Sequence, residues 1–483
     1  MLGLSVLLTV FAAVWLLQLD WTSLSPPTDN IEQLTWVHAL EWGYYKHPPL
    51  PTWLFWLFEQ VLGATARTTY VAGAACTLAS MALMWSLLRR LRGAHAATVA
   101  LLAALCITYY NARLYYYNHE TVLMVLVAAS AWACWRAHVS GSMRWWAALG
   151  LALGLGALAK YQIAVSVACV LVFWLQQRAW RVRAHRHGLL LAAAVALLVL
   201  APHLDWLRSH DFAPIRYASE SSLAAGVGFW RRCAGALIWV FNQLINRAFP
   251  AWLLLAWAAH GARRAAAEPV VAPAATPDAS AAATALQASS RSFLLIWGGL
   301  PLAFMPTMGL LTGAGLQLHW GTPFLLFAVP AVMELTSGRV AWSRVPLRSV
   351  WLAFGIIQAL LLMESVLSSP KGPALLQEHR WRAFDSAALA QAIESPARAA
   401  LGGRICVVSG PPDESGALAL QLHDRPLVLI DGRQDHSPWV PRDLVAECGM
   451  VRLRAAAAGP GWHAAGAAFP KLSWQVALPH AVP

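Results

Sequence analysis

Acidic and basic side chains gather directly after the first hydrophobic segment of the chain. Asp29 and Glu32 are three residues apart, so on a helix that begins near them they would share one face. Asp29 or the residue before it could equally be an ordinary helix N-cap. Lys46 and His47 follow within one loop, and two prolines then end any helix. A carboxylate can act as a general base on a hydroxyl or amine, while cations neutralise a phosphate leaving group. The stretch therefore favours chemistry on an anionic substrate.

Other ionisable residues lie at ends of later hydrophobic segments, on what we expect to be the same side. They are Arg113, Glu120, Lys160, His203, Asp205, His210, Asp211 and His319. Taken singly, such residues are usually snorkelling or loop residues, and Lys160 alone could be structural. Together they predict one polar site at the lipid boundary, suited to the headgroup of an anionic lipid-linked molecule. The composition of this set does not identify a sugar.

The composition indicates that lipid covers most of the surface. Of 483 residues, 58% are hydrophobic and 12% are charged, whereas soluble domains have roughly 25% charged residues. The net charge is +12, but the basic clusters lie beside hydrophobic runs, so we expect no nucleic-acid partner. The 26 tryptophans suit many membrane–water boundaries.

These features predict a mainly α, polytopic helical bundle of about eleven membrane spans. The candidate spans are residues 2–19, 68–88, 94–109, 120–136, 144–159, 161–176, 187–203, 235–258, 292–311, 318–336 and 348–367. Residues 161–176 could instead continue the preceding span as one bent helix. The stretch 51–63 is too short to cross and should lie along the interface. The first span lacks a cleavage site and is expected to remain uncleaved.

Charge predicts the orientation. With a cytoplasmic N-terminus, the arginines at 89–92, 136–144, 178–186, 263–264 and 339–348 all face the cytoplasm. An odd number of spans then places the C-terminus outside, together with the loop at 20–50 and with Lys160. We therefore expect the function on the outer face.

Two domains are predicted. Residues 1–367 form the membrane domain, with a flexible cytoplasmic linker rich in Ala, Pro and Ser at 265–290. Residues 368–483 form a small extracytoplasmic α/β domain with short buried strands. Cys406 and Cys448 could pair there. No residue spacing supports zinc, and no cluster of oxygen ligands supports Mg²⁺ or Mn²⁺, so we expect neither metal nor cofactor.

The first outer loop resembles that of a known family. Asp29-Asn30, followed by the segment Trp42-Gly43-Tyr44-Tyr45-Lys46-His47-Pro48-Pro49-Leu50, is similar to the corresponding loop of bacterial glycosyltransferase family 39-like proteins of the GT-C class. These are relatives of the protein O-mannosyltransferases and of the lipid A aminoarabinose transferase. Further stretches agree in order: "NHETVL" from Asn118, "RWWAALGLALGLGALAKYQ", "PHLDWLRSHDF", "GLQLHWGTPF" and "RPLVLIDGRQDHSPWVPRDL".

The resemblance implies a GT-C-type helical bundle in a bacterial inner membrane. It also implies transfer of a sugar from a polyprenyl-phosphate donor, with inversion, to an acceptor that is a protein, lipid A or an envelope glycan. Asp29 would be the catalytic base, and Glu120 a second acidic group that orients acceptor or base. The expected donor-phosphate or substrate-binding residues are Tyr45, Lys46, His47, Lys160, His210, His319 and Trp320.

Three residues depart from the family pattern. Asn30 stands where Glu is usual, Lys46 where an acid is usual, and Leu207 where Asn is usual. A second hypothesis is therefore an inactive homologue that binds lipid-linked sugars or acts as an assembly partner. A third is a flippase, although no inverted halves with broken helices are evident.

Overall fold

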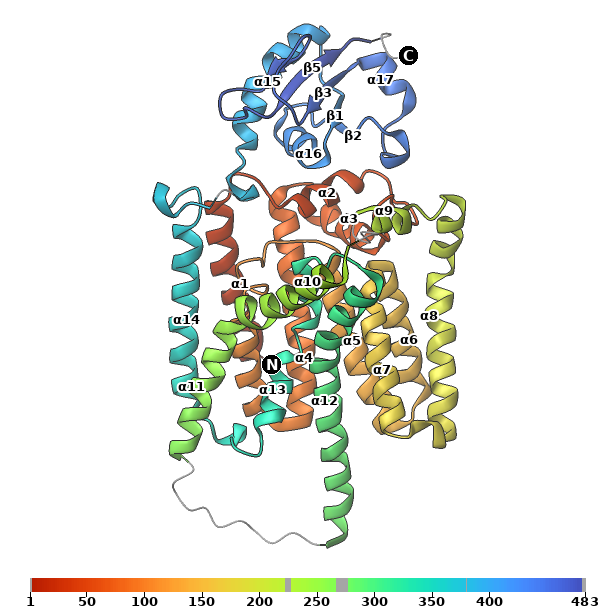
Figure 1. Cartoon of the computed structure of the whole chain (residues 1–483), viewed down its shortest axis with the longest axis vertical. Helices are drawn as coiled ribbons and strands as arrows, with labels where there is room; N and C mark the ends of the chain where they lie inside the picture. Colours follow the sequence, from red (N-terminus) through yellow and green to blue (C-terminus); the bar gives the residue numbers. More distant parts are fainter. Residues whose placement is uncertain (1, 222–226, 266–276, 379, 480–483) are drawn as a thin grey trace.

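The computed structural model describes residues 2–221, 227–265, 277–378 and 380–479. It consists of a tall helical body with a small α/β unit seated on one end (Figure 1). The body contains helices α1 (Leu2–Thr22), α2 (Thr28–Trp36), α3 (Leu50–Leu62), α4 (Ala66–Ala104), α5 (His119–Ser140), α6 (Met143–Ala159), α7 (Ala164–Gln176), α8 (Arg183–Ser209), α9 (Ala213–Ser221), α10 (Phe229–Phe241), α11 (Phe249–Ala265), α12 (Pro277–Thr312), α13 (Ala328–Thr336) and α14 (Leu347–Leu367).

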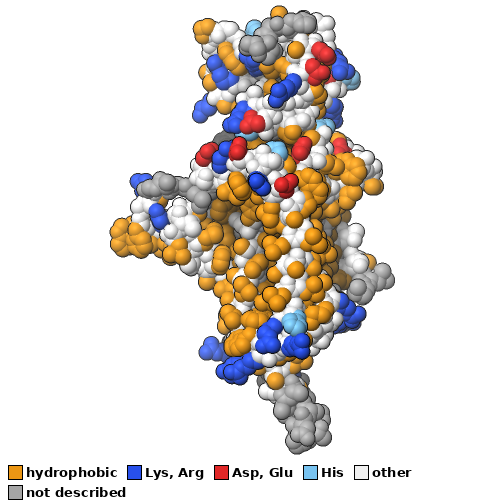
Figure 2. Space-filling view, turned by 90° about the vertical axis from the view of Figure 1, so that its right-hand side faces the viewer, with side chains coloured by type: hydrophobic (Ala, Val, Ile, Leu, Met, Phe, Trp, Pro, Cys, Tyr) orange, Lys and Arg blue, Asp and Glu red, His pale blue; other side chains and the backbone are white. Residues whose placement is uncertain are grey.

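The long helices have the composition of membrane spans. In the described part of the chain, α1, α4, α5, α8, α12 and α14 are long and apolar enough to cross a bilayer, and α6 and α7 are shorter apolar helices. Figure 2 shows a broad hydrophobic surface on one face of the body, with a group of Lys and Arg at the end of the body away from the α/β unit and charged side chains of both signs near that unit. The prediction of a mainly helical membrane fold is confirmed.

Helix α4 consists of two predicted spans. Gly93 interrupts it with a φ of 82° and a ψ of 164°, a conformation that glycine adopts without steric cost. The Trp85 indole donates to the Thr98 hydroxyl at 3.3 Å, so the chain folds back at the turn. The two arms correspond to the predicted segments 68–88 and 94–109.

Two other predicted spans are not continuous helices. Residues 235–258 divide into α10, a π-helical segment at Asn242–Arg247, and α11. Gln243 is buried in that segment and donates to the Leu318 carbonyl at 2.8 Å, so the polar residue interrupts the span. Residues 318–336 divide into a 3-10 segment at Leu318–Phe324 and the short α13. The predicted count of about eleven spans is therefore not confirmed.

The stretch at 265–290 also differs in part from the prediction. Helix α12 already begins at Pro277, so residues 277–290 are helical rather than a flexible linker. The Ala-rich composition of this stretch accounts for the helix, because alanine has the highest helix propensity. Residues 266–276 lie outside the described part of the chain.

The α/β unit comprises α15 (Ser386–Leu401), α16 (Pro412–Gln421), α17 (Arg442–Cys448) and strands β1 (Val407–Gly410), β2 (Leu427–Ile430), β3 (Met450–Arg454), β4 (His463–Ala464) and β5 (Ser473–Ala477). The sheet order is β2-β1-β3-β5-β4, with β1 parallel to β2 and β3. A disulfide joins Cys406 to Cys448, next to β1 and β3.

Helix α16 joins the α/β unit to the membrane body by packing on α2. Gly416 is required at this contact, because a Cβ there would lie 2.3 Å from Ile31 Cγ2. The close approach brings the first turn of α16 near the polar residues of α2.

Candidate active site

Asp29, Lys46 and His47 line a cavity on the side of the membrane body that bears the α/β unit. We call this cavity, of about 380 Å³, the polar pocket. Its chemically relevant lining residues are Asp29, Lys46, His47, Glu120, Lys160, His319 and Trp320. The structure thus brings together seven of the nine predicted site residues, from segments that are up to 291 positions apart in the sequence (29 to 320).

Asp29 is held in place by two helices. It lies in the first turn of α2, where the helix dipole stabilises a carboxylate. The Asn118 side-chain amide donates to Asp29 Oδ2 at 2.9 Å. Asn118 is itself fixed as the N-cap of α5, because its Oδ1 accepts from the Thr121 N–H at 2.9 Å. The position of the Asp29 carboxylate is therefore set by the start of α5.

Asn30 is a structural residue. Its side chain is fully buried and donates to the Thr69 hydroxyl at 2.7 Å and to the Tyr115 carbonyl at 2.8 Å. Its Oδ1 accepts from the Tyr117 N–H at 2.9 Å. An amide satisfies all three partners, whereas a glutamate would place its carboxylate against the Tyr115 carbonyl. The departure at position 30 is thus accounted for by packing.

Lys46 forms an ion pair with Glu32, with Nζ at 2.9 Å from Oε1. Burial raises the pKa of Glu32 to about 7, although the Lys46 ammonium opposes this shift. The Lys46 ammonium also lies 5.7 Å from the centroid of the Tyr217 ring. The cation at position 46 is therefore anchored by the neighbouring helix.

Glu120, Lys160 and His319 form a connected group. Lys160 Nζ bonds to Glu120 Oε1, and His319 Nε2 lies 3.4 Å from the same oxygen. Lys160 reaches the pocket because the chain is extended there, at the end of α6, with φ −163° and ψ 138°. Its ammonium lies 5.8 Å from the Trp320 ring centroid. An ammonium has three N–H donors, so bonds remain for an anionic ligand.

His47 and His119 lie ring to ring, with centroids 4.0 Å apart. Burial holds the pKa of His47 well below its usual range, and the nearby His119 and Lys160 lower it further. His47 is therefore neutral at pH 7. Ligand atoms of Glu32, His47 and His119 all lie within 4.8 Å of one another, which makes this group the candidate for holding a metal ion.

Tyr45 and His210 do not line the polar pocket, contrary to the expectation for a single shared site. They line a neighbouring cavity of about 590 Å³ between the membrane body and the α/β unit, which we call the junction pocket. Tyr45 stacks on His436 with centroids 3.9 Å apart, and His210 stacks on Trp206 at 4.2 Å. Tyr217 lines both pockets, so the two cavities adjoin.

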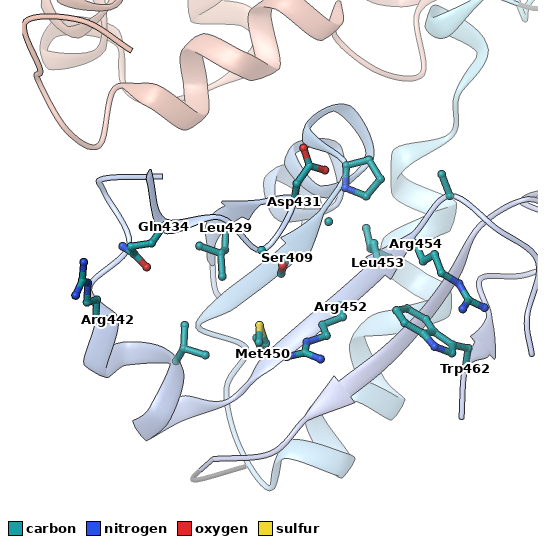
Figure 3. Close-up of a pocket in the computed structure, with 15 residues that line it drawn as sticks. Ser409, Leu429, Asp431, Gln434, Arg442, Met450, Arg452, Leu453, Arg454 and Trp462 are labelled. Carbon is teal, nitrogen blue, oxygen red and sulfur yellow. The ribbon is translucent and has the colours of Figure 1, made fainter. Parts of the chain in front are cut away.

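A third cavity, of about 670 Å³, lies on the α/β unit alone (Figure 3). Figure 3 shows Ser409 of β1 and Arg452 of β3 near the middle of the cavity, and Arg442 of α17 at its left edge. The cavity lies at the carboxyl ends of β1 and β2, a place where open α/β sheets often bind ligands. Its charged lining residues are Asp431 and three arginines, Arg442, Arg452 and Arg454, so positive charge predominates there.

Some residues of the site were not among the predicted site residues. Asn118 and His119 belong to a quoted motif, but only the fold shows that the first bonds to Asp29 and that the second contacts His47. Tyr217 carries no sequence signal that distinguishes it from other loop tyrosines. Asp413 reaches this region from the α/β unit, where burial raises its pKa to about 6 against the opposing effect of Lys46.

Comparisons with known proteins agree with this architecture. Residues 46–206 match the family described as dolichyl-phosphate-mannose-protein mannosyltransferase. The matched range includes Lys46, His47, Glu120 and Lys160, but neither Asp29 nor His319. In Rhizobium johnstonii, the lipopolysaccharide core galacturonosyltransferases RgtA and RgtB are each 28% identical, over 198 and 239 residues. These matches cover 40% and 48% of this chain, and only 39% and 48% of the relatives' own lengths.

Two crystal structures of ArnT from Cupriavidus metallidurans share the fold. The apo form has a TM-score of 0.50 at 17% identity, covering 93% of this chain and 92% of ArnT. The form bound to undecaprenyl phosphate has a TM-score of 0.52 at 16% identity, covering 100% and 99%. In part of its sequence and in its overall fold, the chain is therefore similar to the family 39-like membrane proteins of the GT-C class, relatives of the protein mannosyltransferases.

Proposed function

We propose that this chain is a membrane glycosyltransferase that moves a sugar from a polyprenyl-phosphate donor to an extracytoplasmic acceptor. The observation that carries the proposal is the composition of the polar pocket. A carboxylate at Asp29 and a separate ammonium at Lys160 line one cavity, so a base and a phosphate-binding cation can act on the same substrate. Undecaprenyl phosphate bound to ArnT, which shares the fold, supports a lipid-phosphate donor.

Each group has a proposed role in the transfer. The acceptor oxygen attacks the anomeric carbon, its proton passes to Asp29, and the carbon–oxygen bond to the phosphate breaks with inversion. The phosphate leaves with the bonding electrons, and the Lys160 ammonium stabilises its charge. Glu120 orients Lys160 through their ion pair, and His319 and Trp320 line the donor side of the pocket.

The acceptor enters, in this proposal, from the junction pocket. That cavity is open between the two parts of the molecule, and it adjoins the polar pocket at Tyr217. It is lined by aromatic rings and by charged groups of both signs, a combination suited to hydroxyl-rich saccharides. Tyr45 and His210 would then contact acceptor rather than donor.

The polar pocket and the α/β unit would face the outside of the cell. The paired Cys406 and Cys448 suit an oxidising compartment, and Lys and Arg gather at the opposite end of the body (Figure 2). The bilayer would then present a lipid-linked donor at the height of the polar pocket.

A kinetic experiment on the purified full-length chain tests the proposal. Transfer to an envelope extract is measured while the concentration of a polyprenyl-phosphate-linked sugar is varied. Lys160→Ala should raise the donor KM more than it lowers kcat, because the donor phosphate loses its cation. Lys371→Ala removes an exposed lysine outside the pocket and should change neither value. No transfer by the wild-type chain with any lipid-linked donor would refute the proposal.

The inactive-homologue hypothesis is not favoured by the site. Asn30 is used in packing and Lys46 in an ion pair with Glu32, so neither departure removes a group from the proposed chemistry. Asp29, Lys160 and His47 remain together in the pocket.

A further inference from the structure

We propose that Glu32, His47 and His119 bind one divalent transition-metal ion, of the Zn²⁺ type, beside the polar pocket. Binding of the ion does not depend on the proposed transferase activity. Only its role, stabilising the phosphate of the donor, rests on that function.

The three side chains have the ligand types and spacing of such a site. Two imidazoles and one carboxylate are the protein ligands of many open zinc sites, in which a fourth position is left for water or substrate. Their ligand atoms lie within 4.8 Å of one another. In a tetrahedral zinc site, with bonds of roughly 2.1 Å, ligand atoms lie about 3.4 Å apart. Side-chain movements of about 1 Å would therefore close the site around an ion.

His119 supplies an independent indication. Its side chain is 2% exposed, and its Nε2 has no hydrogen-bond partner among the residues that the structure describes. A buried polar atom without a partner is costly, and such atoms are rare in folded proteins. His119 is one of the three residues of the cluster, and its ring lies against the His47 ring. A metal bound through Nε2 would satisfy this nitrogen.

A phosphate would bring negative charge into a region where carboxylates and cations are already paired. Glu32 pairs with Lys46, and Glu120 pairs with Lys160. A divalent ion would offset the charge of the phosphate, and its open position can take a phosphate oxygen.

Lys46 is the competitor for this ion. Its ammonium holds Glu32 Oε1 at 2.9 Å, so the metal must use the second carboxylate oxygen or displace the lysine. Removing the ammonium should therefore strengthen metal binding, whereas removing a histidine should weaken it. These opposite directions separate a built site from adventitious binding.

The experiment measures Zn²⁺ binding to the full-length chain, purified without a polyhistidine tag and stripped with a chelator. Calorimetric titration and elemental analysis should give one tightly bound Zn²⁺ per chain. His47→Gln and His119→Gln should each weaken Zn²⁺ binding by at least about tenfold to 100-fold. That loss is typical when a residue hydrogen-bonded to a metal ligand is changed, and removing the ligand itself should cost no less. Lys46→Met should tighten it. His187→Gln alters an exposed histidine near the start of α8, outside the cluster, and should leave Zn²⁺ binding unchanged.

The proposal is overturned if the stripped chain takes up no tight Zn²⁺, or if both glutamine variants bind it like the wild type. A monodisperse elution profile of each variant excludes misfolding as the cause of a loss. Zinc binding by a chain that transfers no sugar would contradict the proposed function alone. Full transfer by a chain that binds no Zn²⁺ would contradict this inference alone.

Discussion

The ion pair between Lys160 and Glu120 provides the sharpest test of the site's electrostatics. We consider Lys160→Met, which keeps the length of the side chain and removes its charge. In the wild type, the Lys160 side chain is 12% exposed and the Glu120 side chain is 4% exposed. The substitution leaves a buried carboxylate without its main partner.

The expected loss is large and depends on pH. Removing one partner of a buried ion pair costs about 3–5 kcal/mol in free energy of unfolding. His319 can recover part of this, because its Nε2 lies 3.4 Å from Glu120 Oε1. In the wild type, burial lowers the pKa of His319, with Lys160 also lowering it and Glu120 raising it. Without Lys160 the pKa of His319 rises, and the protonated ring stabilises the variant at low pH. This stabilisation is lost as pH rises through the new pKa.

Thermal unfolding in detergent, followed by tryptophan fluorescence, can measure the effect. Lys160→Met, Glu120→Gln and the double variant are compared with the wild type at pH 5.5 and pH 8. We expect Lys160→Met to be the least stable form at pH 8 and closer to the wild type at pH 5.5. The double variant should be more stable than Lys160→Met, because no unpaired carboxylate remains.

Two results would refute the reasoning. The first is a double variant that loses the sum of the two single losses, which would mean that the two side chains are not coupled. The second is a loss in Lys160→Met that is equal at both pH values, which would mean that His319 takes no part.

Three further predictions concern single residues. Asp29→Asn should lower kcat by about 10²- to 10⁴-fold, the usual contribution of a general base, with the donor KM unchanged in the same transfer assay. Asn30→Glu should lower the free energy of unfolding by about 3 kcal/mol or more, since it buries a carboxylate against the Tyr115 carbonyl; a melting temperature equal to the wild type would contradict this. Asp413→Asn should stabilise the chain by about 1 kcal/mol at pH 7.5, because the raised pKa of Asp413, about 6, means that stability is lost as its carboxyl ionises. At pH 3, below the pKa of 3.8 that the Asp413 carboxyl has without burial, that variant should melt like the wild type.

Much of the site could be predicted from the sequence because charged residues are rare in a membrane protein. Glu120 and Lys160 are 40 positions apart, yet both lie at ends of apolar segments, and the predicted orientation puts them on one side of the membrane. The structure joins them in an ion pair. Charge placement thus indicates which residues meet, although not which atoms bond.

The sequence could not separate the polar pocket from the junction pocket. Tyr45 and Lys46 are adjacent, but Lys46 pairs with Glu32 while Tyr45 stacks on His436 of the α/β unit. Tyr45 faces the junction pocket because the α/β unit packs against this loop and supplies His436, and no local sequence feature indicates that contact. The candidate metal ligands were missed for a related reason. Glu32, His47 and His119 come from α2, the following loop and the start of α5, so no local spacing marks them.

The interrupted spans show a limit of hydrophobicity alone. Residues 235–258 are apolar enough to suggest one helix, but the buried Gln243 bonds to the Leu318 carbonyl and the helix widens to a π-turn. That bond also positions the segment that carries His319. The polar residue Gln243, within the apolar stretch 235–258, thus marks the point near the site where the α-helix is interrupted.

The most direct test of the central claim is the structure of this chain with a bound polyprenyl phosphate. We predict that the phosphate lies in the polar pocket, within about 3 Å of Lys160 Nζ, the distance of a charge-assisted hydrogen bond, with Asp29 facing the same cavity. A phosphate found elsewhere, for example against Arg442 and Arg452 on the α/β unit, with the polar pocket empty, would contradict the account.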